Sequence, residues 1–237
     1  IKPDAVVCVA TIKALKYHGG TPKDKILEEN MESLEKGMSN LYRHINNLKE
    51  KFGLNVIVAI NKYNTDTETE LNFVKTELEK INVSSSIVES WAKGGNGAID
   101  IAQKLVKLTE QKEHFKYIYE LNESIKEKID KISTEIYGAK NVIYSEKALK
   151  NIKRIEELGY SNLPVCIAKT QYSFSDDAKK LQCDEPFEIN VRDVEIKAGA
   201  GFIVALAGKI MTMPGLPKVP SAESIDIDDN GEIVGTF

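Results

Sequence analysis

The segment Asn55–Thr67, NVIVAINKYNTDT, decides the fold of this chain. It begins with the unbroken apolar run Val56–Ile60, which is typical of a strand covered on both faces in a parallel α/β sheet. The run ends in the polar loop Asn61–Asn64. Thr65 and Glu68 then have the spacing of a capping box, so a helix is expected to begin there. The loop thus joins the carboxyl end of a strand to the start of a helix, which is where open α/β sheets bind ligands.

A second unit of the same shape follows along the chain. Ser86–Ser90 is an expected strand, Trp91–Gly97 (WAKGGNG) is a glycine-rich loop, and a helix is expected from Ala98. Each of the two strand ends offers an aromatic residue and a lysine. The rings of Tyr63 and Trp91 are therefore predicted to sandwich a flat heterocycle in a shared pocket, and packing in the core is the alternative.

Two further segments could bind anions. Lys93, Gly94 and Gly95 resemble an anion-binding turn, because glycines let backbone N–H groups converge before a helix. An ordinary tight turn has the same composition, and the chain contains no GxxxxGK[ST] motif. Lys169-Thr170-Gln171 follows the apolar run Val165–Ala168 at a third strand end and could face the same crevice.

The remaining pattern continues the alternation of strands and helices. Further strands are expected up to Thr11 and at Phe187–Val194 and Phe202–Ala207. Helices are expected at Ile12–His18, from Thr21, and at Asn40–Lys51, Asp66–Lys80, Ala98–Lys107, Leu121–Tyr137 and from Ser145 to Leu158. Met211–Pro220 is expected to be an irregular proline-rich loop. Because the chain starts at Ile1 and enters a strand almost at once, it is expected to be the back part of a longer protein.

The composition is that of an ordinary soluble globular protein, with 237 residues, 42% hydrophobic residues and 29% charged residues. A formal net charge of −4 gives no broad basic field for nucleic acid. The chain contains three cysteines without CxxC spacing, which indicates a reducing cytoplasm, with Cys8 and Cys166 as buried thiols. No apolar run reaches membrane-spanning length. The three histidines lie apart in the sequence, so none is assigned to catalysis or to a metal.

Four segments together resemble formate–tetrahydrofolate ligase, also called formyltetrahydrofolate synthetase. They are VATIKALKYHGG (residues 9–20), WAKGG (91–95), PVCIAKTQYS (164–173) and MTMPGLP (211–217). The likeness runs from end to end of this chain and covers the carboxyl-terminal part of the family, a little under half of the usual polypeptide.

The resemblance implies an enzyme that joins formate to tetrahydrofolate at the expense of ATP. Formate would attack the γ-phosphate to give formyl phosphate, and N10 of the folate would attack that to give 10-formyltetrahydrofolate. The family holds the pterin between the tryptophan of WAKGG, here Trp91, and a residue that is usually phenylalanine, here Tyr63. Lys13 stands where the family signature normally has arginine, so the bidentate fork of that side chain is lost.

The same resemblance implies the ligands of the full enzyme. ATP, Mg²⁺ and tetrahydrofolate are its substrates, a monovalent cation is compatible with it, and family members are commonly homotetramers. The family's Walker A loop lies upstream of Ile1, so this chain alone is expected to be unable to form formyl phosphate. The crevice for nucleotide or phosphate is expected to include Lys93, Gly94, Gly95, Lys169, Thr170 and Gln171.

The expected fold is α/β, with mostly parallel Rossmann-like sheets flanked by helices, as in P-loop NTPases, and a small α+β carboxyl-terminal domain. Residues 1–43 would end a truncated nucleotide domain, 44–135 would form the folate-binding domain and 136–237 the carboxyl-terminal domain. Two alternatives remain. One is a non-catalytic folate-binding or assembly module that needs a separate amino-terminal subunit, and the other is an NTPase-like protein of different function.

Overall fold

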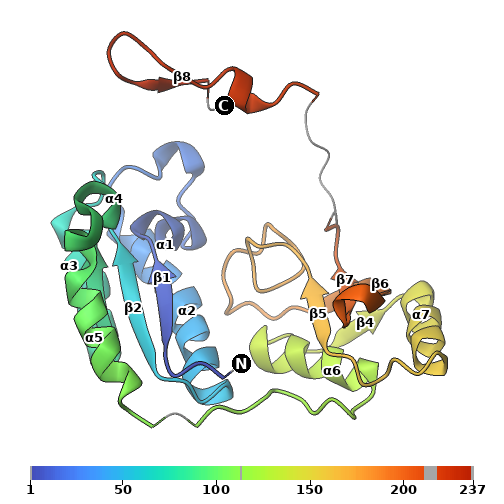
Figure 1. Ribbon diagram of the computed structural model, residues 1–237. Coiled ribbons are helices and arrows are strands. Elements are labelled where there is room, and N and C mark those ends of the chain that lie inside the picture. The colour runs from blue at the N-terminus through green and yellow to red at the C-terminus, as the bar shows by residue number, and fades with distance from the viewer. Residues whose placement is uncertain (1, 113, 211–217, 236–237) are drawn as a thin grey trace.

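The computed structural model describes residues 2–112, 114–210 and 218–235, and Figure 1 shows two α/β lobes side by side. The first lobe contains a parallel sheet in the order β1-β2-β3. Its strands are β1 (Val6–Ala10), β2 (Val56–Asn61) and β3 (Ser84–Val88), and its longer helices are α1 (Ile12–His18), α2 (Met31–Asn46), α3 (Glu68–Lys80) and α5 (Ile99–Thr109). Residues Val56–Ile60 are all buried, as expected for the covered central strand of a parallel sheet.

The second lobe contains a four-stranded sheet in the order β4-β6-β7-β5. Its strands are β4 (Val142–Tyr144), β5 (Val165–Ala168), β6 (Ile189–Lys197) and β7 (Phe202–Ala207), and its helices are α6 (Ile125–Lys131) and α7 (Glu146–Glu157). β6 and β7 are antiparallel, whereas the pairs β4–β6 and β5–β7 are parallel. The prediction of an α/β fold with mostly parallel sheets and flanking helices is therefore confirmed.

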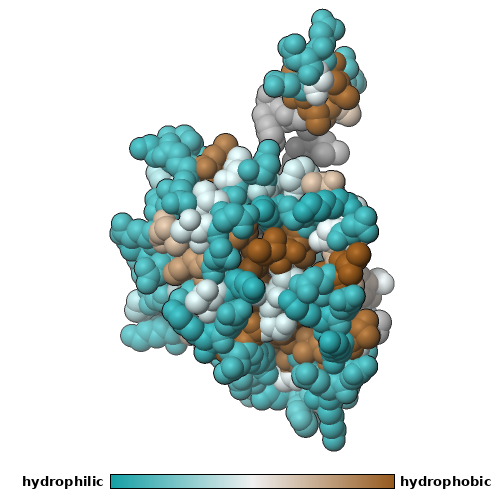
Figure 2. Space-filling model, turned by 90° about the vertical axis from the view of Figure 1, so that its left-hand side faces the viewer, coloured by the Kyte–Doolittle hydropathy of each residue, from teal (hydrophilic) through white to brown (hydrophobic). Residues whose placement is uncertain are grey.

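Short elements complete the described chain. They are the 3-10 turns Lys23–Lys25, Gly94–Ala98, Ala198–Ala200 and Ser221–Glu223, the π-helical turns Asn47–Lys51 and Ile132–Ile136, the helix α4 (Ser90–Lys93), and the strands β8 (Asp226–Ile227) and β9 (Ile233–Val234). β8 and β9 form an antiparallel hairpin that stands clear of the lobes and carries exposed apolar side chains (Figure 2). None of the described helices combines the length and the apolar character needed to cross a membrane.

Several predicted boundaries were wrong. The helix expected from Asp66 begins at Glu68, and its capping box joins Thr67 to Glu70 instead of Thr65 to Glu68. Both spacings fit the sequence TDTETE. The later one is used because Tyr63 and Asp66 hold the preceding residues in a turn, with Tyr63 N donating to Asp66 Oδ2 at 2.7 Å and Asp66 N to the Tyr63 carbonyl at 3.1 Å.

Two long helical predictions also needed correction. The stretch after Thr21 forms the short turn Lys23–Lys25 before α2 begins at Met31, with the side chain of Asn30 capping it by accepting from Ser33 N. The helix expected over Leu121–Tyr137 begins at Ile125, because Ser124 and Glu127 form a capping box at that point. Its last turn is π-helical.

The prediction of a buried Cys166 was wrong, and Cys8 is half-buried. β5 lies at the edge of its sheet, and side chains alternate along a strand. Val165 is buried in the second core, so the next residue, Cys166, points to the other face and is exposed. Cys183, by contrast, is buried.

Helices α1 and α2 pack backbone to backbone through glycines. A Cβ added to Gly37 would lie 1.9 Å from the Leu15 carbonyl oxygen, and one added to Gly19 would lie 1.7 Å from that of Ser33. Real Cβ atoms cannot approach a carbonyl so closely. These two glycines therefore set the short separation between the helices, which in turn positions the residues of α1.

We expect Gly37→Ala to destabilise the chain by about 1–2 kcal/mol, because overpacking costs more than the roughly 1 kcal/mol that alanine gains in a helix. Urea unfolding would measure the change. Gly199→Ala is the matched control, since no atom lies within 4 Å of its added Cβ. A Gly37→Ala variant as stable as this control would contradict the close packing.

Candidate ligand site between two strand ends

The site is built on the loops that follow β2 and β3. These strands are parallel neighbours, with Asn61 opposite Val88, so both loops leave the same edge of the sheet. Two hydrogen bonds join the loops: Lys62 N donates to the Val88 carbonyl at 3.0 Å, and the indole Nε1 of Trp91 donates to the Lys62 carbonyl at 2.7 Å. The sequence prediction that these strand ends form one site is consistent with this geometry.

Both predicted aromatic residues are at the surface. Trp91 is 61% exposed and Tyr63 is 38% exposed, so neither ring is enclosed in the core. An exposed indole whose N–H is already bonded offers its face to a partner. The alternative interpretation, in which the two rings pack inside the protein, does not fit these exposures.

Lys13 and Asp66 support Tyr63 through contacts that no sequence motif predicts. Nζ of Lys13 lies 4.5 Å from the centroid of the Tyr63 ring, a cation–π contact that joins α1 to the loop. Asp66 is buried, and its Oδ1 has no hydrogen-bond partner among the described residues. Burial raises the pKa of the Asp66 carboxyl group. Only the fold brings α1 over this loop, so no local motif could have revealed the contact.

Lys62 and Lys93 are paired with glutamates. Lys62 Nζ lies 2.7 Å from Glu68 and 4.0 Å from Glu89, and Lys93 Nζ lies 2.5 Å from Glu89. Bonding to Lys93 holds the pKa of Glu89 below its ordinary value. The charge of Lys93 is therefore already balanced in this structure, and a ligand phosphate would have to compete with Glu89 for it.

The glycine-rich segment forms a tight connection. Gly94 has a φ of 56°, which favours glycine, and Glu89 N donates to the Gly97 carbonyl at 3.1 Å. A Cβ on Gly97 would lie 2.5 Å from backbone atoms of Glu89, whereas Gly95 has open space around it. Gly97 therefore closes the turn, and the backbone at Gly94 and Gly95 stays accessible.

Lys169, Thr170 and Gln171 line a different pocket. It has a volume of about 270 Å³ and lies where the loop after β5 meets α1 and α2, and neither Tyr63 nor Trp91 lines it. Burial lowers the pKa of Lys169 to about 8. β5 belongs to the second sheet, so its end does not join the ends of β2 and β3 at one sheet edge.

His18 and His44 line this second pocket too. Their positions are 26 apart in the sequence, and no spacing rule connects them. They meet because α1 and α2 pack closely, a contact that the pattern of histidines could not indicate. The part of the chain that the structure describes contains no group of three or more His, Cys, Asp or Glu residues that could hold a metal ion.

Comparison with known proteins identifies the family of this chain. The sequence model of the family described as "Formate--tetrahydrofolate ligase" matches residues 1–237. This chain belongs to the formate–tetrahydrofolate ligase family. It is 49% identical over 237 residues to the formate–tetrahydrofolate ligase of Symbiobacterium thermophilum and 51% identical over 235 residues to that of Campylobacter concisus.

The alignments cover 100% and 99% of this chain but 43% of each relative. The chain therefore spans less than half the length of these ligases. Three of the four family-like segments lie in described parts of the structure, at α1, at α4 and around β5. The fourth, residues 211–217, lies outside the described residues.

Proposed function

We propose that this chain supplies the tetrahydrofolate site of an ATP-dependent formate–tetrahydrofolate ligase. The complete enzyme forms formyl phosphate from formate and ATP, and then transfers the formyl group to N10 of tetrahydrofolate. ADP, phosphate and 10-formyltetrahydrofolate are the products. The hydrogen bond of 2.7 Å from Trp91 Nε1 to the Lys62 carbonyl carries the proposal, because it fixes an exposed indole beside the Tyr63 loop.

In this proposal Tyr63 and Trp91 hold the pterin ring by stacking. Their contacts with a planar heterocycle contribute roughly 0.5–1.5 kcal/mol each beyond the burial of area. Lys13 supports the Tyr63 ring from the side of α1. The accessible backbone at Gly94 and Gly95, with Lys93, is proposed to face the nucleotide or phosphate. Lys169, Thr170 and Gln171 are proposed as polar contacts for a substrate in their own pocket, beside α1 and α2. ATP would bring Mg²⁺; we assign no residue here to Mg²⁺ or to a monovalent cation.

The proposal includes the organisation of the complete enzyme. Residues 1–43 belong with a nucleotide domain, 44–135 form the folate-binding domain and 136–237 form the carboxyl-terminal domain. The first boundary lies within α2, so the first two parts would share that helix. The enzyme would work in the cytoplasm as a homo-oligomer, and a homotetramer is the family's common state.

We expect the isolated chain to release no ADP in a formate-dependent manner. Phosphoryl transfer depends on groups that position and neutralise the phosphates, and the sequence has no Walker A motif to supply them. Coupled-enzyme detection of ADP, with and without formate, would measure this. A full-length ligase of the family is the positive control, and turnover by the purified 237-residue chain would contradict the prediction.

The competing proposal is a folate-binding or assembly module that acts with a separate amino-terminal subunit. Coverage of 43% of each relative is compatible with both proposals. Adding the missing front part of a family member as a second polypeptide would separate them. Restored formate-dependent ADP release would favour the two-subunit arrangement. Activity found only when both parts form one chain would favour a fragment.

A further inference from the structure

We propose that the pocket between α1, α2 and the loop after β5 is a binding site for a small oxyanion, held by His18, His44 and Lys169. The three side chains come from three separate elements and line one cavity of about 270 Å³. Lys169 belongs to both this site and the proposed function. The site does not depend on the stacking of the pterin ring by Tyr63 and Trp91.

The pocket has the charge of an anion site. No carboxylate lines it among the described residues, and all three ionisable nitrogen groups are basic. Two further cations lie close by: the Arg43 guanidinium carbon is 5.8 Å from the Phe174 ring centroid, and Lys23 Nζ is 5.6 Å from that of Tyr172. The absence of lining carboxylates argues against a metal ion and favours an anion.

The negative charge of Asp176 acts on Lys169, and this carboxylate already accepts hydrogen bonds. Its Oδ2 accepts from Asn190 N at 2.8 Å and from Asn190 Nδ2 at 3.0 Å. Asp176 therefore moderates the positive charge of the pocket without filling it. The tyrosines Tyr137 and Tyr172 also line the pocket, and burial raises the pKa of Tyr137, which stays neutral.

The two imidazoles are available to a ligand. Neither His18 nor His44 has a side-chain hydrogen bond to another described residue, and both rings reach the pocket. His44 packs against Phe174, with ring centroids 4.6 Å apart, which orients it. Lys169 Nζ donates to the Thr170 carbonyl at 3.1 Å and to that of Ser173, and lies 4.7 Å from the Tyr137 ring centroid. Two of the three ammonium protons thus have carbonyl acceptors, and the third has no hydrogen-bond acceptor among the described residues.

Protonation should be coupled to binding at this site. Burial lowers the pKa of both histidines, and the positive charges of His18 and Lys169 lower that of His44 further. A bound oxyanion offsets this repulsion and therefore raises both pKa values. Affinity is then highest below the pKa of the free imidazoles and falls as the pH rises towards the pKa of the bound ones. For each histidine, a pKa that binding raises by one unit corresponds to a tenfold loss of affinity between the pKa of the free imidazole and that of the bound one.

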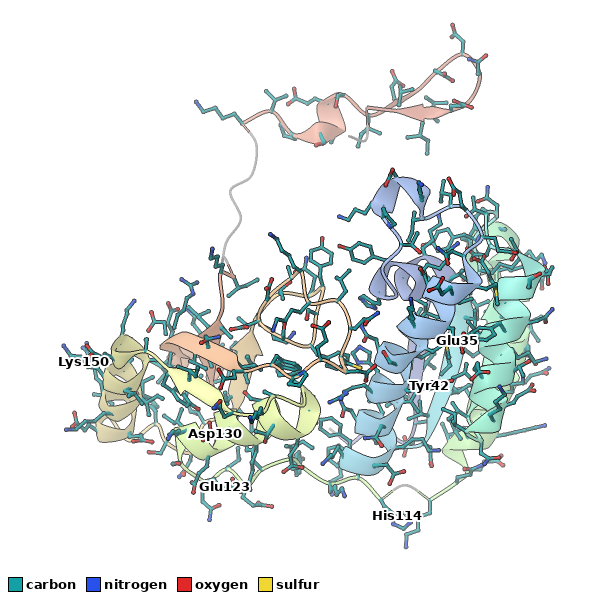
Figure 3. All side chains as sticks on the ribbon, turned by 180° about the vertical axis from the view of Figure 1, so that it is seen from behind. Glu35, Tyr42, His114, Glu123, Asp130 and Lys150 are labelled. Atoms are coloured by element: carbon teal, nitrogen blue, oxygen red, sulfur yellow. The ribbon has the colours of Figure 1, made fainter. Side chains whose placement is uncertain are left out.

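The test uses NMR titration of the histidine ring protons in the 237-residue chain. The chain has three histidines, and His114 lies away from the pocket on the segment that joins the lobes (Figure 3), so it is an internal reference. His18→Gln and His44→Gln assign the signals. Sulfate is the probe, because its charge is constant between pH 5.5 and 8. We expect sulfate to raise the pKa of His18 and His44 by about one unit and to leave His114 unchanged.

Lysine variants locate the anion. Lys169→Met should weaken sulfate binding at least about tenfold, while Lys150→Met, on the exposed face of α7 (Figure 3), should not change it. If Lys169→Met disturbs the loop, the response of His18 to sulfate in His44→Gln provides a second measure, and it should be weaker than in the unmodified chain. Inorganic phosphate and ADP are compared at equal concentration: the one that raises the pKa values at the lower concentration identifies the source of the oxyanion.

Two results would overturn the proposal. One is an equal effect of chloride at the same ionic strength, which would indicate general screening. The other is unchanged pKa values of His18 and His44 at saturating sulfate and phosphate. The experiment needs neither tetrahydrofolate nor turnover. It can therefore disprove the oxyanion site without affecting the proposed pterin site, and a failed test of the pterin site would not affect the oxyanion site.

Discussion

Replacing Lys16 with methionine should destabilise the chain by about 3–5 kcal/mol, the cost of leaving one partner of a buried ion pair without the other. Lys16 is 1% exposed and Glu70 is fully buried, and their charged atoms lie 2.8 Å apart. Lys16 also donates to the Glu28 carbonyl at 2.7 Å. The pair joins α1 to the start of α3, so it supports the Tyr63 loop that enters α3.

Glu70 has a second role in the same place. It accepts from Thr67 N at 3.2 Å in the capping box of α3, and from Asn30 N at 3.3 Å at the start of α2. Its carboxylate therefore ties together the beginnings of two helices as well as α1. Without the ammonium of Lys16, those backbone bonds and a longer one from the Thr67 hydroxyl, at 3.4 Å, would have to stabilise a buried negative charge.

Urea unfolding of Lys16→Met, Glu70→Gln and the double variant would measure the coupling. We expect the double variant to be more stable than the sum of the two single losses predicts, because neither charge is then left alone. The exposed pair Glu32–Lys36, at 2.6 Å, is the matched control, and removing Lys36 should cost less than about 1 kcal/mol. Equal effects at the buried and exposed pairs would show that burial does not govern the contribution of Lys16.

Replacing Trp91 with alanine should weaken tetrahydrofolate binding to the complete enzyme by about 1–3 kcal/mol, or roughly 5–150-fold in Kd. The change removes a stacking face that is 61% exposed and aligned by its bond to the Lys62 carbonyl. Calorimetry with tetrahydrofolate measures the affinity directly. An affinity unchanged by Trp91→Ala would remove this residue from the site.

Three further variants separate stacking from other effects. Trp91→Phe keeps an aromatic face and loses the Nε1 donor, so it should lose less affinity than alanine. Tyr63→Phe keeps the ring and removes the hydroxyl, and its affinity should stay close to that of the unmodified enzyme if stacking dominates. Tyr160→Ala, at an exposed ring after α7, is the control for a general effect of removing a surface aromatic residue.

Local patterns were sufficient for many elements of the fold. The apolar run at β2 is the buried central strand, β7 has its expected bounds at Phe202–Ala207, and Ser145 caps α7 as expected. These predictions succeeded because a strand buried on both faces and a capped helix each have a recognisable sequence pattern within a few residues. Tyr63 and Trp91 also follow their strand ends, which is how they could be selected as candidates.

Other features depended on contacts between distant segments. TDTETE offers two equivalent capping boxes, and the contact of Tyr63 with Asp66 decides between them. Cys166 is exposed because β5 is an edge strand. The apolar residues around Cys166 do not indicate that the strand lies at an edge. Sequence order likewise suggested that the end of β5 would meet those of β2 and β3, but it lies in another sheet.

The amino-acid sequence alone determined the class of fold, the family and the two aromatic residues at neighbouring strand ends, because periodicity, caps and motifs are local properties. The tertiary structure alone decided that Lys16 and Glu70 are a buried pair, that Lys13 supports Tyr63, and that His18 and His44 meet Lys169 in one pocket. The physical reason is that these side chains meet only after α1 has packed against α2 through the glycine contacts. Each contact joins residues that are distant in the sequence, so no local motif contains both of them.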